Sequence, residues 1–142
     1  MKKKIDLACI NSLLKRGFLL TAFFFAFGLA QAQYIYNGIG HQIGRVDGNY
    51  YYNGNGHQIG RVGGKYIYDG SGHNIGRVDG NYIYDGSGHQ IGRTDGNYIY
   101  NGTGHQIGRI DGDYIYDGTG HQIGRTKDLN RSEVIIFFYF FM

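Results

Sequence analysis

Residues 82–97 read YIYDGSGHQIGRTDGN, and near-copies of this sixteen-residue unit follow one another from Tyr34 to Leu129. The six copies span residues 34–49, 50–65, 66–81, 82–97, 98–113 and 114–129. Eight positions hold the same residue in every copy: two Tyr, three Gly, one His, one Ile and one Arg. A fixed period is typical of repeat architectures, in which each unit buries its apolar surface against its neighbours.

Each copy contains two strand-forming segments. The first is Tyr-Ile-Tyr at residues 82–84, which is aromatic and β-branched, and the second lies at residues 89–94. A Gly-rich loop separates the two segments, and the Asp-Gly pair after the second segment is a strong hairpin signal. The hairpins therefore straddle the repeat boundaries. Five are complete, at residues 41–52, 57–68, 73–84, 89–100 and 105–116.

The sixth turn is different, because Lys127-Asp128 stands where the other copies have Asp-Gly or Gly-Gly. This leaves Tyr34–Tyr36 and His121–Thr126 without hairpin partners. Pairing between these two segments would close a ring and remove both exposed sheet edges. We therefore predict an all-β fold of tandem short β-hairpins, built from six 16-residue repeats and closed into a toroid or barrel-like ring. An open β-solenoid is the alternative.

The strand register is expected to follow from the turn. A two-residue turn at Asp47-Gly48 would place Arg45 opposite Tyr50, where the two side chains can stack, and Gly44 opposite residue 51. Alternation then places His41, Ile43, Arg45, Tyr50 and Tyr52 on one face, and Gln42, Gly44, Val46, Asn49 and Tyr51 on the other. The pattern alone leaves open which face is buried.

Residues 1–32 are predicted to be a secretory signal peptide. Lys2 to Lys4 form a basic start, residues 17–29 are mainly apolar, and Ala30-Gln31-Ala32 is an A-x-A cleavage site. We expect cleavage between Ala32 and Gln33, which also removes Cys9, and export to the periplasm or the cell exterior. An uncleaved membrane anchor is the alternative, but the apolar run is short for a span. The processed chain is predicted to have no transmembrane span.

The predicted domains are the signal peptide (1–32), the β-hairpin repeat domain (33–129) and a hydrophobic C-terminal tail (130–142). From Gln33 onward there are nine Lys or Arg and ten Asp or Glu, a net charge of −1, which offers no basic field for nucleic acid. The tail ends in nine apolar residues, Val134–Met142, too few for a spanning helix. It is either an aggregation-prone or membrane-touching segment, or an atypical, poorly ordered end such as an altered reading frame would produce.

The combination of Tyr-Ile-Tyr-Asp-Gly, Ile-Gly-Arg and Asp-Gly motifs behind a signal peptide resembles the secreted bacterial five-fold β-flower proteins. The resemblance extends from Tyr34 to about Thr126. It implies short hairpins arranged around a pseudo-symmetry axis, and it supplies no activity. This chain has five complete hairpins but six units, so the resemblance leaves the symmetry number open.

The repeated Tyr and Arg residues are candidates for ligand binding, because aromatic faces stack on sugar rings; the alternative is that the Tyr residues form the core. The candidates are Tyr50, Tyr52, Tyr66, Tyr68, Tyr82, Tyr84, Tyr98, Tyr100, Arg45, Arg61, Arg77, Arg93 and Arg109. A ring of His residues, at positions His41, His57, His73, His89, His105 and His121, is a weaker candidate for metal binding or pH sensing. Hydrogen bonding of each His to its Gly-rich loop is the favoured interpretation, and the loop Asp and Asn residues are expected to stabilise turns rather than bind calcium.

No catalytic constellation is present in the repeats, so we expect no enzymatic activity and no cofactor. The glycines at 38, 40 and 44 lack the spacing of a dinucleotide-binding loop. The favoured hypothesis is an exported structural or binding module of unknown ligand. The alternatives are a self-assembling, amyloid-like extracellular fibre and a glycan-binding module that uses Tyr and Arg. The candidate partners are accordingly a cell-surface glycan or further copies of the chain.

Overall fold

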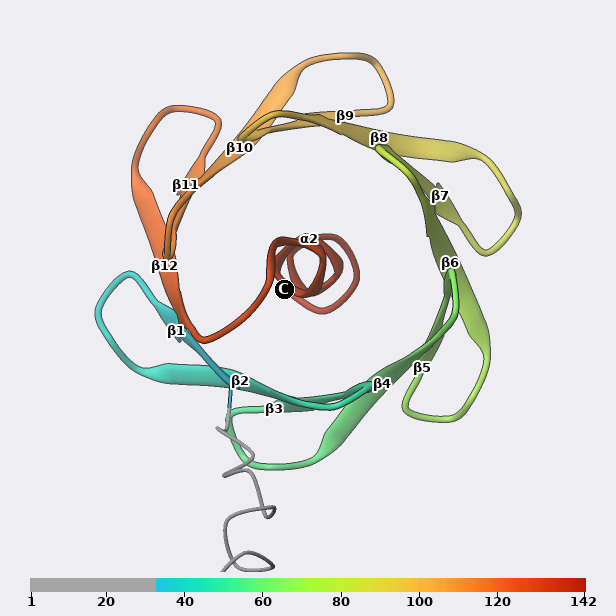
Figure 1. Cartoon of the computed structure of the whole chain (residues 1–142), viewed down its shortest axis with the longest axis horizontal. Helices are drawn as coiled ribbons and strands as arrows, with labels where there is room; N and C mark the ends of the chain where they lie inside the picture. Colours follow the sequence, from blue (N-terminus) through green and yellow to red (C-terminus); the bar gives the residue numbers. More distant parts are fainter. Residues whose placement is uncertain (1–32) are drawn as a thin grey trace, which may run out of the picture. The chain divides into compact units, whose positions relative to one another are not determined.

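The structure, a computed structural model, describes residues 33–142, and the predicted signal peptide and Cys9 lie outside this range. Within it, twelve strands form one closed antiparallel sheet around a helix (Figure 1). The strands are β1 (Gln33–Asn37), β2 (Gln42–Asp47), β3 (Tyr50–Asn53), β4 (Gln58–Gly63), β5 (Tyr66–Asp69), β6 (Asn74–Asp79), β7 (Tyr82–Asp85), β8 (Gln90–Asp95), β9 (Tyr98–Asn101), β10 (Gln106–Asp111), β11 (Tyr114–Asp117) and β12 (Gln122–Lys127). The helix is α2 (Arg131–Phe140).

The barrel closes where the sequence predicts. Strand β1 pairs with β12 in an antiparallel register that matches Tyr34 with Lys127 and Asn37 with Gly124. Each of the other strands pairs with its neighbours in sequence order. The predicted all-β ring is therefore confirmed, and the open solenoid is wrong. Figure 1 shows the Gly-rich loops directed outward from the ring.

The turn position, in contrast, differs from the prediction by one residue. Asp47 pairs with Tyr50, so the two turn residues are Gly48 and Asn49, and Arg45 lies opposite Tyr52 instead of Tyr50. Gly48 has a φ of 57°, whereas Asn49 does not have a positive φ. A turn with positive φ only at its first central residue follows the type II′ pattern, which requires Gly there. The prediction assumed the type I′ pattern, which requires a positive φ at both positions.

The predicted division between the two faces is largely correct. Gly44, Val46 and Tyr51 are buried and face the barrel interior, whereas Arg45 and Tyr50 lie on the outer wall. Gln42 and Ile43 are the exceptions, and Gln42, predicted on the inner face, is exposed and pairs with Tyr36 on the outer wall. The β1–β2 register jumps from the Ile35–Gly44 pair to the Tyr36–Gln42 pair, so Ile43 is the extra residue of a β-bulge. Because the bulge interrupts the alternation, Ile43 is half-buried and packs against the core.

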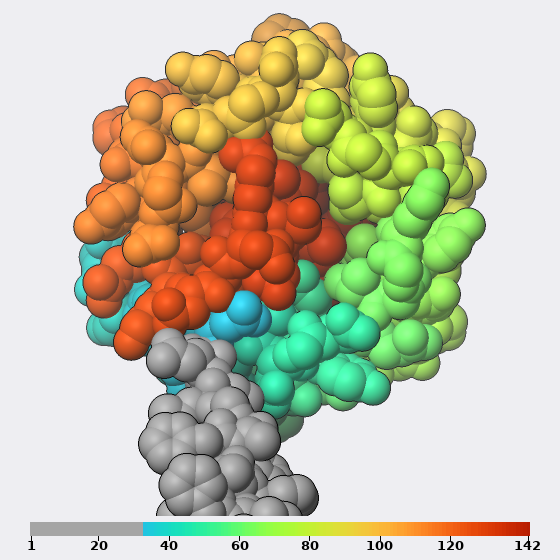
Figure 2. All heavy atoms as spheres, in the orientation of Figure 1, coloured from blue at the N-terminus to red at the C-terminus, as the bar shows by residue number. Residues whose placement is uncertain are grey.

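Helix α2 runs through the centre of the barrel (Figures 1 and 2). It begins with a capping box in which Asn130 Oδ1 accepts the Glu133 N–H at 3.0 Å and Glu133 Oε2 accepts the Asn130 N–H at 2.8 Å. Residues 134–137 are buried. From Val134 onward the helix is apolar on every side, as a helix surrounded by a sheet requires.

Five consecutive aromatic side chains of this segment each lie against a different inner-wall glycine. The contacts are Phe137 with Gly44, Phe138 with Gly108, Tyr139 with Gly92, Phe140 with Gly76 and Phe141 with Gly60. A Cβ on Gly44 would lie only 2.7 Å from Cε2 of Phe137, so the absence of a side chain makes the contact possible. The glycines at this repeat position form a ring of recesses that receives the helix.

The tail interpretation therefore needs correction. Residues 130–142 are neither a poorly ordered end nor a segment free to touch a membrane, because α2 supplies the centre of both hydrophobic core clusters. The repeats contribute Ile and Val from the wall, and the tail contributes the residues that fill the space inside it. Within residues 33–142, no helix combines the length and the apolar character needed to cross a membrane.

Candidate functional site

The outer wall of the barrel carries a belt of partly exposed tyrosines, which we call the outer belt. The first Tyr of each of units 2–6 is 43–48% exposed, although it is a large aromatic residue. These residues are Tyr50, Tyr66, Tyr82, Tyr98 and Tyr114. The third residue of each unit, also Tyr, is half-buried on the same wall. The tyrosines of the outer belt are therefore not the core, which consists of Ile, Val, Tyr51 and the α2 side chains.

Each arginine of the repeats stacks over one of the half-buried tyrosines. The distance from the guanidinium carbon to the ring centroid is 4.1–4.8 Å in all six pairs. The pairs are Arg45–Tyr52, Arg61–Tyr68, Arg77–Tyr84, Arg93–Tyr100, Arg109–Tyr116 and Arg125–Tyr36, the last of which spans the closure of the ring. The predicted Arg–Tyr stacking occurs, but with the third residue of the following unit because the turn is displaced by one residue.

Five of the six arginines also lie next to an exposed tyrosine, whereas Arg45 lies next to the half-buried Tyr34. Arg61 pairs across strands with Tyr50, and Arg77 pairs with Tyr66. The structure therefore brings together an exposed ring, a guanidinium and a second ring, and repeats this group around the barrel. All the predicted Tyr and Arg candidates lie on this wall.

One part of the outer belt is hollowed into a groove of about 200 Å³. Tyr66, Arg77 and Asp85 line this groove, together with the loop at Ser87. Asn74 also lines it, and the other five units have the longer Gln at this position. Arg77 Nε is buried and has no hydrogen-bond partner among the described residues. The groove combines an aromatic ring, a cation and a carboxylate on one face.

The Gly-rich loops at the periphery have a common hydrogen-bond pattern. Asp69 Oδ1 accepts the backbone N–H groups of Ser71 and His73, both at 2.9 Å. The bond from the His73 N–H is the main reason that the pKa of Asp69 lies below its usual value. Equivalent Asx residues act in the other five loops, at Asn37, Asn53, Asp85, Asn101 and Asp117. The carboxyl and amide oxygens stabilise the turns, as the sequence interpretation predicts.

The histidines lie on these same loops. His73 Nδ1 is 3.3 Å from Asp69 Oδ2, and His105 Nδ1 is 2.9 Å from Thr103 Oγ1. The side chain of His73 is 78% exposed and that of His121 is 84% exposed. Among the described residues, no group of three His, Cys, Asp or Glu side chains converges as a metal site would require. The side chains of His73, His89, His105 and His121 therefore contact residues of their own loops.

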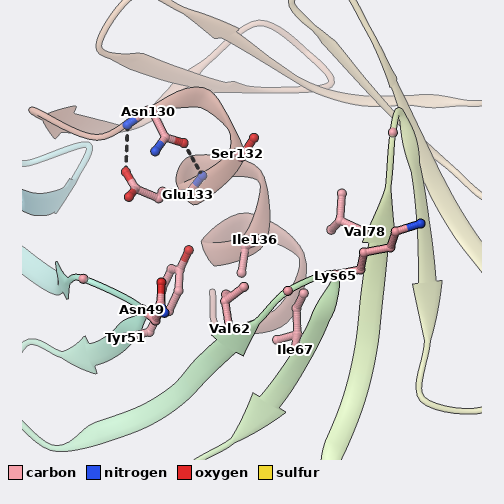
Figure 3. Close-up of a pocket in the computed structure, with 13 residues that line it drawn as sticks. Asn49, Tyr51, Val62, Lys65, Ile67, Val78, Asn130, Ser132, Glu133 and Ile136 are labelled. Atoms are coloured by element: carbon pink, nitrogen blue, oxygen red, sulfur yellow. Dashed lines mark hydrogen bonds between the residues drawn. The ribbon is translucent and has the colours of Figure 1, made fainter.

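A second concave site lies at the mouth of the barrel where α2 begins, and we call it the mouth pocket (Figure 3). It has a volume of about 350 Å³. Its wall includes Tyr51, Lys65 and Glu133. Sequence analysis did not predict this site. Tyr51 and Lys65 are visible in the sequence as departures from the repeat, but their position at the mouth depends on α2 being inside the barrel.

The fold thus defines a class of protein: a closed barrel of repeated β-hairpins with a helix through its centre. The chain belongs to the 5-fold beta-flower protein family, whose model matches residues 31–142. The match continues through α2 to the last residue, so the C-terminal segment is part of the family domain. This member closes its ring with six hairpin units. Comparison with curated proteins and with solved structures found no match.

Proposed function

We propose that this β-flower domain is an exported, non-enzymatic binding module whose outer belt binds a glycan polymer. The observation that carries the proposal is the ring of exposed tyrosines, each of which lies beside an arginine. Aromatic faces can stack on the apolar face of a sugar ring, while a guanidinium donates hydrogen bonds to hydroxyl or carboxylate oxygens.

The repetition of the site favours a polymeric ligand. A polymer that contacts two or more equivalent Tyr–Arg groups gains avidity, which exceeds single-site affinity by roughly 10²–10⁴-fold in linked systems. The stacked arginines favour the same function, because each guanidinium is held in place by Tyr before a ligand arrives. The groove beside Tyr66 and Arg77 is a concave part of the belt and therefore our preferred position for one sugar residue.

The experiment measures binding of the purified protein to isolated peptidoglycan and to cellulose by co-sedimentation, alongside a glycan microarray. We expect saturable binding to at least one polymer, and a weaker interaction for the double variant Tyr66→Ser and Tyr82→Ser. Circular dichroism should show that the variant keeps its fold, since both rings are nearly half exposed.

The matched control is Ile39→Ser, which removes a 78% exposed apolar side chain from a peripheral loop. The control should bind as the unmodified protein does. Absence of binding to every polymer, or equal loss in the control and the belt variant, would contradict the proposal.

The alternative of a self-assembling fibre has less support. Pairing of β1 with β12 leaves no open edge in the sheet, and open edges are the usual template for strand addition. A fibre would require the barrel to open. Growth of dye-binding fibrils from the folded protein at neutral pH would favour this alternative over glycan binding.

A further inference from the structure

The mouth pocket lies where the repeat loses its symmetry. Tyr51 occupies an inner-wall position that is Ile in the other five units. Lys65 and the preceding Gly63-Gly64 replace the Asp-Gly-Asn turn found in three other units. Both changes lie at the same mouth of the barrel, and both Tyr51 and Lys65 line the pocket. Six nearly identical units therefore produce one site that differs from the rest of the rim.

The Tyr51 hydroxyl is the distinctive polar group in this pocket. Tyr51 is only 1% exposed, and its ring packs against Phe141 with a centroid separation of 5.1 Å. Its hydroxyl has no hydrogen-bond partner among residues 33–142. Burial, and secondarily the charge of Glu133, raises the pKa of this hydroxyl, so it stays protonated and can donate. A ligand acceptor in the pocket would give this hydroxyl a hydrogen-bond partner.

Glu133 supplies the complementary acceptor. Its Oε2 accepts the Asn130 N–H in the capping box, whereas Oε1 has no hydrogen-bond partner within the described part of the chain. Figure 3 shows Tyr51 and Glu133 on the same side of the pocket. A donor and an acceptor are therefore available together at the polar end of the site.

The remaining walls favour an uncharged ligand. Val62, Ile67, Val78 and Ile136 form the apolar part of the lining, and Asn49, Asn130 and Ser132 add uncharged polar groups. Lys65 is already paired, because its Nζ lies 2.9 Å from Asp79 Oδ1 and extends away from Glu133. An anion would meet the negative charge of Glu133, and a cation would lose hydration in the pocket with a single carboxylate oxygen to replace it.

We propose that the mouth pocket binds a small uncharged molecule with an apolar body and a hydroxyl group, which accepts a hydrogen bond from Tyr51 and donates one to Glu133. The volume of about 350 Å³ lies near the lower end of the range for small-molecule sites and admits a single substituted ring. This binding is independent of the outer belt, because the two sites lie on opposite sides of the barrel wall.

The test uses fluorine NMR with four probes of similar size: 4-fluorophenol, fluorobenzene, 4-fluorobenzoate and 4-fluorobenzylammonium. We expect a saturable shift or broadening for 4-fluorophenol. Fluorobenzene should bind roughly fivefold or more weakly, since it cannot form the two hydrogen bonds. Tighter binding of the benzoate or the benzylammonium probe would overturn the assignment of an uncharged ligand.

Two variants locate the site. Tyr51→Phe removes only the hydroxyl and should weaken 4-fluorophenol binding by roughly fivefold. Tyr51→Ile installs the residue of the other five units, so it fits the repeat and provides a second variant expected to fold. The control Tyr98→Phe removes a hydroxyl from the outer belt and should leave binding unchanged. No saturable binding of 4-fluorophenol, or equal binding by both Tyr51 variants and the unmodified protein, would overturn the proposal.

Discussion

The ring of Phe137 packs directly against the α-carbon of Gly44, in a space that a side chain at position 44 would occupy. The same relationship recurs between four more inner glycines and residues 138–141. The invariant glycine of the Ile-Gly-Arg motif therefore has a tertiary role: it allows the helix to fit inside a narrow barrel of twelve short strands. The barrel wall and helix α2 therefore depend on each other for close packing, although they come from segments of very different composition.

Replacement of this glycine should destabilise the fold. Gly44→Ala would place a Cβ 2.7 Å from Phe137 Cε2 and 3.2 Å from the Tyr52 carbonyl oxygen. Overpacking of this kind costs about 1–3 kcal/mol, and urea denaturation monitored by circular dichroism measures it. The control is Gly63→Asp, which restores the residue of four other units. Its Cβ would meet only side-chain atoms, the nearest being Tyr68 Cε2 at 3.3 Å, and stability should change by about 0.5 kcal/mol or less. If Gly44→Ala and Gly63→Asp had the same free energy of unfolding, the result would argue against close packing at Gly44.

The Arg–Tyr stacks should contribute a measurable coupling energy. Arg61 and Tyr68 are the best pair for a double-mutant cycle, since Gly63 replaces the Asp that can pair with Arg in other units. Arg61→Met and Tyr68→Leu, singly and together, should give a coupling of about 0.5–1 kcal/mol in chemical denaturation. Strictly additive effects would mean that the stack does not stabilise the outer wall.

The peripheral loops should make stability depend on acid pH. The pKa values of Asp69 and Asp85 are lowered mainly by the backbone N–H groups of His73 and His89, and that of Asp117 mainly by the Thr119 hydroxyl. A lowered pKa in the folded state stabilises the protein above the unfolded-state pKa of about 3.9, and this contribution is lost as pH falls through the folded-state value.

Three loops of the same chain supply the control, because they have Asn where the others have Asp. The triple variant Asp69→Asn, Asp85→Asn and Asp117→Asn keeps the turn acceptors but removes the titrating groups. Its stability should fall less between neutral pH and pH 3 than that of the unmodified protein. An unchanged acid profile would show that other groups determine the pH dependence.

Cleavage of the predicted signal peptide should leave a mature chain that begins at Gln33. Cleavage after Ala32 leaves β1 complete, including Gln33, whose Nε2 donates to the Asp128 carbonyl oxygen at 2.8 Å. N-terminal sequencing of protein recovered from the periplasm or medium tests this prediction. A mature chain that starts several residues later would lack the strand that closes the barrel, and a chain that retains residues 1–32 would support the membrane-anchor alternative.

The ring could be predicted because the features that indicate it are local in the sequence. These features are the sixteen-residue repeats, the alternation of strand and turn signals, and one broken turn at Lys127-Asp128. The turn register was wrong because Asp-Gly fits two turn types, and only the backbone shows that Gly48 and Asn49 are the central residues. The predicted division between the faces failed at Gln42 and Ile43 because a bulge leaves no clear signal in a pattern of period two.

The position of α2 could not be predicted from its composition. Its apolar residues do not gather on one face, so their spacing predicts neither a surface helix nor a half-buried strand. The sequence does hold one usable signal, since Asn130 followed by Glu133 is a capping-box pattern that marks a helix start. Four of the five outer-belt tyrosines were among the sequence candidates, and Tyr114 was not. The mouth pocket was missed because its walls come from both the repeats and this helix.

Native-state hydrogen exchange of the α2 amides tests the central claim, that this helix is the core of the barrel, most directly. The amides of residues 135–137 should exchange as slowly as those of β7 and β8, with the free energy of global unfolding, because the helix cannot be exposed while the barrel stays closed. Fast exchange of these helix amides while the strand amides remain protected would contradict the account.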